Sequence, residues 1–126
     1  MASNTAPVVR TFKCDAAIGK GKFVKFGTDE DHVAICSGNT DKIIGVTLAA
    51  TTAAEDLVEI AVSGGAKVEA GETIAAGKSV VSDANGDAAQ SNLDGDYAFG
   101  IAFDAAVDGD IFGIQIGPHF CHAADD

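Results

Sequence analysis

Residues 71–79, GETIAAGKS, contain the residue types of a loop that binds nucleotide phosphates. Such a loop keeps four residues between its first glycine and the Gly-Lys-Ser, because its backbone N–H groups must converge on the phosphates. Here five residues separate Gly71 from Gly77, and one of them, Glu72, would add a negative charge. The loop should also open a helix, whereas residues 79–82 and the Asn-Gly turn after them predict a strand and a hairpin. We therefore interpret the stretch as strand-forming and not as a nucleotide site.

Cysteine and histidine side chains could hold a metal near the C-terminus. His119, Cys121 and His122 are three soft ligands close together, but a tetrahedral zinc site needs a fourth, and the spacing matches no familiar zinc pattern. The other two cysteines, Cys14 and Cys36, are far apart in the chain, and no Cys-x-x-Cys occurs. We therefore expect neither a disulfide framework nor a metal site.

Residues 83–87, DANGD, place oxygen ligands at alternate positions, as a calcium loop does, and Asp94 falls at the twelfth position. The glycine that such a loop needs at its sixth position is replaced by Ala88, and no flanking helices are expected. A hairpin turn around Asn-Gly explains the same residues. The sequence thus predicts a turn here, without a calcium site.

No catalytic arrangement is recognisable. The chain has no Gly-x-Ser-x-Gly elbow, and no histidine lies near a cysteine or serine in a familiar pattern. His32 falls in an expected strand over residues 32–36, where we expect it to face solvent. We predict a protein that is not an enzyme, with no catalytic residue and no cofactor.

The composition indicates one domain built from strands. The 126 residues are 47% hydrophobic, mostly Ala, Val and Ile, with 15 glycines to serve turns and only 6% aromatic residues. The formal net charge of −11 at pH 7 repels nucleic acid and anionic membranes, so we exclude both as partners. The N-terminus does not resemble a signal peptide, and no apolar run is long enough to span a membrane, so we expect a soluble protein.

Three blocks occur twice in the same order, which indicates an internal repeat. Lys78 follows Lys22 by 56 residues, Gly100 follows Gly45 by 55, and Asp110 follows Asp56 by 54. Each block combines a turn residue with alternating apolar residues, as in a half-buried strand, and no segment has a clear helical face. The repeated blocks are IGKGKFV at 18–24 with IAAGKSV at 74–80, IGVTL at 44–48 with FGIAF at 99–103, and EDLVEI at 55–60 with GDIFGI at 109–114.

These patterns predict an all-β fold of eight to ten short strands in two pseudo-equivalent halves, residues 18–64 and 74–117. The domain would cover 13–117 as a single compact β-barrel, tulip-like or sandwich structure. We expect residues 1–12 to form a flexible N-terminal arm and residues 118–126 a C-terminal tail.

The same blocks, together with GGAKVEAGETIAAGKSV, resemble a family of small phage capsid decoration, or cement, proteins over residues 14–117. The resemblance implies a β-rich protein that binds the outer surface of an assembled, expanded head and stabilises it against the pressure of packaged DNA. It also implies the major capsid protein as partner, synthesis in the host cytoplasm and a final place on the outside of the virion. Members of the family commonly form homotrimers, although dimers also occur among cement proteins. If the N-terminal arm gains order on the capsid, its capsid-facing residues are Pro7, Val8, Val9, Arg10 and Phe12.

An alternative is a small β-barrel binding module, because VEAGETIAAGKSVV also resembles the turn sequence of biotinyl and lipoyl carrier domains. Those domains present a modified lysine at a hairpin tip, and the corresponding residues 83–87 contain no lysine. The alternative is therefore a module of that architecture without the modified lysine.

Overall fold

The computed structural model describes residues 8–39, 41–91 and 97–120, which form ten strands. No helix occurs in these ranges, and hence none of membrane-spanning length. The protein is all-β, as predicted. The strands are β1 (Val8–Cys14), β2 (Phe23–Phe26), β3 (His32–Ile35), β4 (Gly45–Thr47), β5 (Leu57–Ser63), β6 (Gly65–Glu69), β7 (Ser79–Ser82), β8 (Ala88–Gln90), β9 (Tyr97–Ala102) and β10 (Ile111–Phe120).

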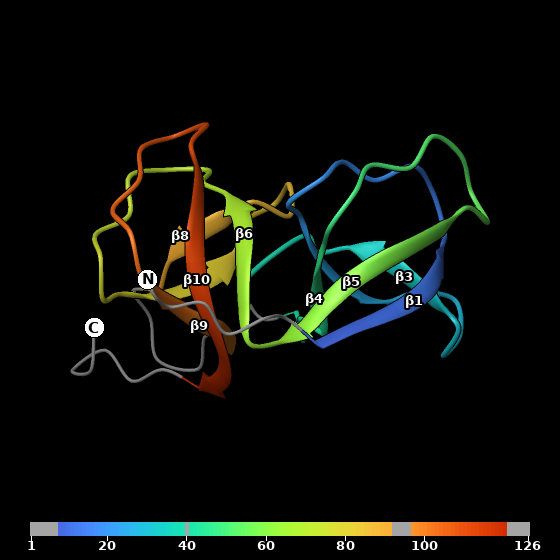
Figure 1. The fold of residues 1–126 in the computed structure, drawn as a ribbon, viewed down its shortest axis with the longest axis horizontal. Coiled ribbons are helices and arrows are strands. Elements are labelled where there is room, and N and C mark those ends of the chain that lie inside the picture. Colours follow the sequence, from blue (N-terminus) through green and yellow to red (C-terminus); the bar gives the residue numbers. More distant parts are fainter. Residues whose placement is uncertain (1–7, 40, 92–96, 121–126) are drawn as a thin grey trace.

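Two sheets lie side by side along the long axis of the molecule (Figure 1). The first is a closed barrel with strand order β1-β3-β2-β4-β5, and the second has the order β6-β10-β9-β7-β8. The strands β6 to β10 correspond in order to β1 to β5, and each pair of neighbours in the second sheet has its counterpart in the closed first barrel. The parallel pair Cys14↔Val33 closes the first barrel, and a single parallel bridge, Ala70↔Ala88, occupies the equivalent place in the second sheet.

Backbone hydrogen bonds repeat at the offsets found in the sequence. The Cys14 N–H donates to the Asp56 carbonyl at 3.0 Å, and the Ala70 N–H donates to the Asp110 carbonyl at 2.7 Å. Both aspartates also accept backbone N–H groups through their side chains, which explains why an aspartate recurs in the third block. The two halves are therefore two copies of one five-stranded unit.

The expected arm over residues 1–12 is wrong for residues 8–12. Val8–Cys14 form a barrel strand that pairs antiparallel with β5, from Val8↔Ser63 to Lys13↔Leu57. Four consecutive exposed side chains, at positions 8–11, obscure the strand in the sequence, because the alternation that marks a half-buried strand is missing there. At the other end, β10 continues to Phe120, so the strand residues extend past the expected boundary at 117. Residues 1–7, Cys121 and His122 lie outside the described residues.

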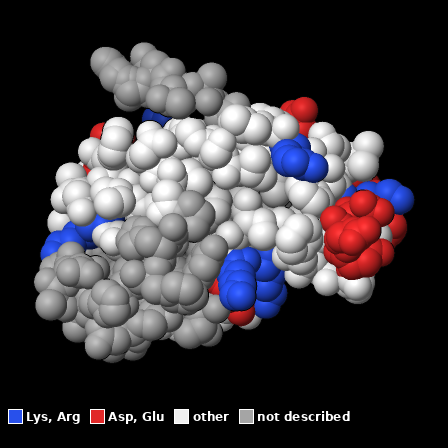
Figure 2. All heavy atoms as spheres, turned by 90° about the horizontal axis from the view of Figure 1, so that it is seen from below, with Lys and Arg blue, Asp and Glu red and all other residues white. Residues whose placement is uncertain are grey.

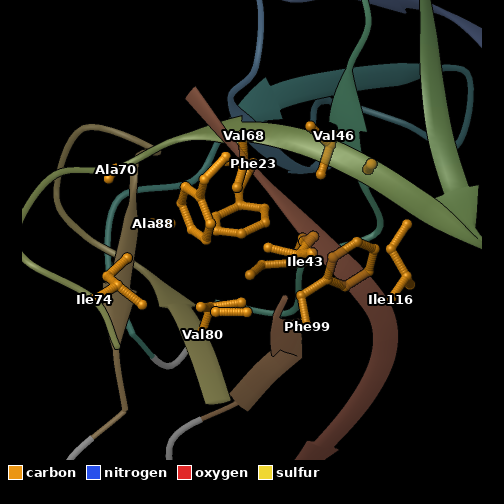
Figure 3. Close-up of a cluster of buried hydrophobic side chains, with 14 of the residues drawn as sticks. Phe23, Ile43, Val46, Val68, Ala70, Ile74, Val80, Ala88, Phe99 and Ile116 are labelled. Carbon is orange, nitrogen blue, oxygen red and sulfur yellow. The ribbon is translucent and has the colours of Figure 1, made fainter. Parts of the chain in front are cut away.

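Adjacent residues of β2 belong to two different cores. Val24 points into the first barrel with five other buried side chains, whereas Phe23 points out of that barrel into the larger cluster of the second half (Figure 3). The inner cluster consists of Cys14, Ile18, Val24, Val33, Val58 and Ile60. The outer face of the first barrel, with Phe23, Val46 and Ala61 in register, thus forms part of the core of the second half.

The start of β2 also fills a gap in the second sheet. In the first barrel the Lys13 N–H donates directly to the Asp31 carbonyl at 2.9 Å. The equivalent donor in the second half, the Glu69 N–H, instead bonds the Gly21 carbonyl at 3.0 Å, and the Phe23 N–H reaches the Gly86 carbonyl at 2.8 Å. Residues 21–23 of the first half therefore stand between β6 and the β7–β8 hairpin.

Candidate interaction surfaces

The Gly-Lys-Ser stretch forms the turn into β7, and no helix follows it. Gly77 has a φ of +87°, with no atom within 4 Å of where a Cβ would lie. Gly71, the first glycine of residues 71–79, packs against the Asp83 carboxylate, whose oxygen would lie 2.0 Å from a Cβ at position 71. A carboxylate at this place repels phosphate, so the local structure does not suit a nucleotide. Residues 77–79 are instead the second-half copy of residues 21–23.

The β7–β8 hairpin is an aspartate-stabilised turn. The Asp83 side chain accepts the backbone N–H groups of Asn85 and Asp87 at 2.8 and 3.0 Å, and Gly86 takes a φ of +79°. Gly86 packs on Ile35 of the first barrel, so the tip is held between the two halves. A carrier domain needs a freely presented tip, which this hairpin does not offer. Within the described ranges, no three His, Cys, Asp or Glu side chains are placed to hold a metal ion.

Lys22 forms an ionic link between the two halves. Its Nζ bonds the carboxylates of Glu69, at 3.3 Å, and Asp87, and its side chain is only 18% exposed. Burial disfavours the charged amine, but the hydrogen bonds to Asp87 and Glu69 outweigh that effect and raise the pKa of Lys22. The lysine of the repeated block is thus an internal structural residue.

The sequence predicts that His32 faces solvent, but the structure places it between two loops. Its side chain is 13% exposed and lies between two carboxylates, with Nδ1 2.7 Å from Asp29 and Nε2 2.8 Å from Glu55. The hydrogen bonds to Asp29 and then to Glu55 raise the pKa of His32. Both ring nitrogens are therefore occupied, which leaves this histidine to join two loops of the first barrel. Glu55 has a φ of +72°, and no other non-glycine residue in the described ranges has a positive φ.

Three of the five proposed capsid-contacting residues share an exposed stretch of β1. Val8 is 55% exposed, Val9 is 41% exposed, and Arg10 is also exposed. Phe12 differs, because it packs against the inner cluster of the first barrel and meets the Phe26 ring edge-on, with centroids 6.1 Å apart. Pro7 lies outside the described residues.

β1 also presents a free strand edge. It pairs with β3 only at Lys13 and Cys14, so in the described part of the chain Val8–Phe12 are paired on the β5 side alone. An unpaired strand edge offers backbone donors and acceptors to another chain. This edge could accept an added strand from a partner.

A second apolar surface is not evident from the sequence. The alternation in residues 99–103 suggests one buried face, and Phe99 is indeed 1% exposed. Ile101 and Phe103, however, are 38% and 55% exposed. The pairing of β9 with β10 is irregular between Ile116 and His119, next to Phe99, so strict alternation does not continue from Phe99 to Ile101. Alternation indicates a strand with an apolar face, but not whether another part of the chain covers that face.

Charge is unevenly distributed on the surface. In the view of Figure 2, acidic side chains gather at one end of the molecule, and the middle of the face carries mostly uncharged residues.

Two comparisons identify what the chain resembles. A structure with a similar fold is the head fiber gp8.5 N base of bacteriophage phi29, with a TM-score of 0.72 and 18% sequence identity over 89% of this chain and 95% of that chain. None of the curated proteins matches the sequence significantly. The model of the phage cement protein family matches residues 3–115. With this match over nearly its whole length, the chain belongs to the phage cement protein family, whose members are structural components associated with the capsid.

Proposed function

We propose that the protein binds the outer surface of the assembled, expanded phage head and stabilises it against the pressure of packaged DNA. The observation that carries the proposal is the family match over residues 3–115. The partner is the major capsid protein, and the bound form is a homotrimer, as the family resemblance implies. The protein would be made in the host cytoplasm and then occupy the outside of the virion.

The exposed part of β1 supports a capsid contact of a different kind from the one expected. Among the described residues, Val8, Val9 and Arg10 are paired on the β5 side alone and already form a strand, so they can bind without first gaining order. A capsid segment would add to this edge through backbone hydrogen bonds, and the two valines would lose their exposure to water. Phe12 would support the strand through its packing on the inner cluster of the barrel. Pro7, outside the described residues, remains part of the proposed contact.

The test is cosedimentation of the purified protein with expanded, undecorated heads of the phage that encodes it. We expect saturable binding at a fixed ratio to the major capsid subunit, and greater resistance of decorated heads to heat. A protein that stays in the supernatant with heads shown to be expanded would contradict the proposal.

Point substitutions test the β1 contact, since deletion of residues 1–12 would remove most of a barrel strand. Val8→Asp should weaken binding to heads while leaving the fold intact. Leu57→Asp is the matched control, because Leu57 is 69% exposed on the neighbouring strand β5. Equal binding of both variants and the wild type would exclude β1 as a contact.

A further inference from the structure

The internal repeat assigns an equivalent to each residue on the outer faces of the two sheets. Val46 pairs with Ala61 in the first half, and Ile101 pairs with Gln115 in the second. The next backbone bond also repeats: the Leu48 N–H donates to the Glu59 carbonyl at 3.0 Å, and the Phe103 N–H donates to the Gly113 carbonyl at 2.9 Å. Ile101 and Phe103 are therefore the structural copies of Val46 and Leu48.

The two copies differ in what covers them. Val46 is fully buried and Leu48 packs against the large core cluster, because the second half of the chain lies on this face. No described part of the chain covers the copy, where Ile101 is 38% and Phe103 55% exposed. The same outer face is an internal contact in one half and an open surface in the other.

The open copy is apolar at Ile101 and Phe103. It is polar at Ser79 and Gln115, which pair with Ile101 where Phe23 and Ala61 pair with Val46 in the first half. Ile111 is 56% exposed and lies diagonally across from Phe103. The residue opposite Phe103 is Gly113, which has no side chain, whereas the equivalent residue of the first half is Glu59. We refer to Ile101, Phe103 and Ile111 as the β9–β10 face. Beside it, Val107 is 56% exposed and lines an open groove of about 460 Å³ together with Ile74, Ala75 and Ala106. A cluster of exposed apolar side chains on a strand pair marks an interaction site.

The border of the β9–β10 face is acidic. Asp104, Asp108 and Asp110 are exposed in the adjoining loop. On β6, Lys67 is exposed and cross-strand from Gly113, and Glu69, cross-strand from Ile111, is paired with Lys22. A matching partner therefore presents an apolar centre and basic side chains around it. A second copy of this chain, with a net charge of −11 and the same acidic border, is a poor match.

We propose that the β9–β10 face is a second docking surface, which binds the outer surface of a capsid subunit through an apolar patch surrounded by basic residues. This inference rests on the proposed function and adds a contact on the half of the molecule that does not contain β1. Two contacts on different halves would let one molecule connect neighbouring parts of the shell.

The experiment is cosedimentation of Phe103→Asp and Ile111→Glu with the same expanded heads. The control is Leu57→Asp, since Leu57 is the first-half copy of Ile111 and is also exposed. Circular dichroism and thermal unfolding verify the fold of each variant, and two substitutions are used so that a folded one is available. We expect each folded variant to bind about tenfold or more weakly, as is typical of an apolar residue at an interface centre, with the control unchanged. Asp108→Lys should also weaken binding.

The outcomes separate the two proposals. Wild-type binding that both folded variants retain would overturn the β9–β10 face and leave the cement function intact. Absence of wild-type binding to expanded heads would overturn both. Sedimentation equilibrium covers self-association: if wild-type oligomers dissociate in the variants while head binding is unchanged, the face joins copies of this chain and the capsid is not its occupant.

Discussion

The Phe23 ring packs edge-to-face against the Phe99 ring, with centroids 5.9 Å apart and ring planes at 73°. Phe23 comes from the barrel of the first half and Phe99 from the second sheet, and both are almost completely buried. One of the largest side chains of the shared core is therefore contributed across the boundary between the two copies. We infer that the two halves unfold together and do not behave as separate domains.

Phe23→Ala should destabilise the whole protein. Removal of a fully buried phenylalanine costs about 3–5 kcal/mol, since the cavity adds to the lost transfer free energy. The free energy of unfolding, measured by urea denaturation, should fall by that amount in a single transition. Phe26→Ala is the control, because Phe26 is 53% exposed and its loss should cost about 1 kcal/mol or less. Two separate transitions in the wild type would contradict the shared core.

Gly100→Ala should be strongly destabilising. A Cβ at this position would lie 2.2 Å from the backbone carbonyl oxygen of Gln115 on β10, and the backbone of a paired strand cannot move away easily. We expect a loss of about 3 kcal/mol or more in thermal or urea unfolding. Gly38→Ala is the control, since no atom lies within 4 Å of the place that a Cβ would take there. A Gly100→Ala protein as stable as the control would refute the close approach of β9 and β10.

The His32 contacts predict a stability that depends on pH. The pKa of His32 is raised above 6.5 in the folded protein, so its contribution is fully present below pH 6.5 and is lost as the pH rises through the folded value. The pKa of Asp29 is lowered from 3.8 by its bond to His32, so that contribution is lost at acidic pH. Lys13 on β1 is the strand-pairing partner of His32 on β3, and the charge of Lys13 also lowers the pKa of Asp29.

NMR titration of the His32 ring should give a pKa above the ordinary value, and unfolding at several pH values should show the loss of stability. His32→Gln should remove the dependence in the neutral range, whereas substitution of Leu57 should not. A normal histidine pKa would exclude the double carboxylate contact in solution.

The thiols of Cys14 and Cys36 should be unreactive in the folded protein. Both are fully buried, and burial, with the nearby Asp41 charge, raises the pKa of Cys36 to about 12. In a Cys121→Ser variant, labelling by a thiol reagent at pH 8 should be slow and should accelerate in denaturant, because the thiolate is the reactive form. Rapid stoichiometric labelling without denaturant would show that these thiols are accessible.

Particular residues show how far the sequence can be interpreted. The three repeated blocks correctly locate β2 with β7, β4 with β9, and β5 with β10, because alternation and turn glycines are local properties. The arm predicted over residues 1–12 is wrong for Val8–Phe12, since the four exposed residues 8–11 show no apolar-polar alternation. The strand predicted around His32 is correct, but the two carboxylate partners of this histidine come from separate loops, and sequence spacing does not indicate such contacts.

The all-β class and the duplication follow from the sequence, because glycine and apolar spacing dictate where strands and turns form. The family follows from the sequence through its match to the family model. Which apolar faces are covered follows only from the way the two halves pack. Val46 and Ile101 occupy the same place in the repeat, yet one is buried by the second half of the chain and the other is open to solvent. Local patterns specify a face, whereas its burial depends on the packing of distant segments, and that packing leaves the β9–β10 face available for a partner.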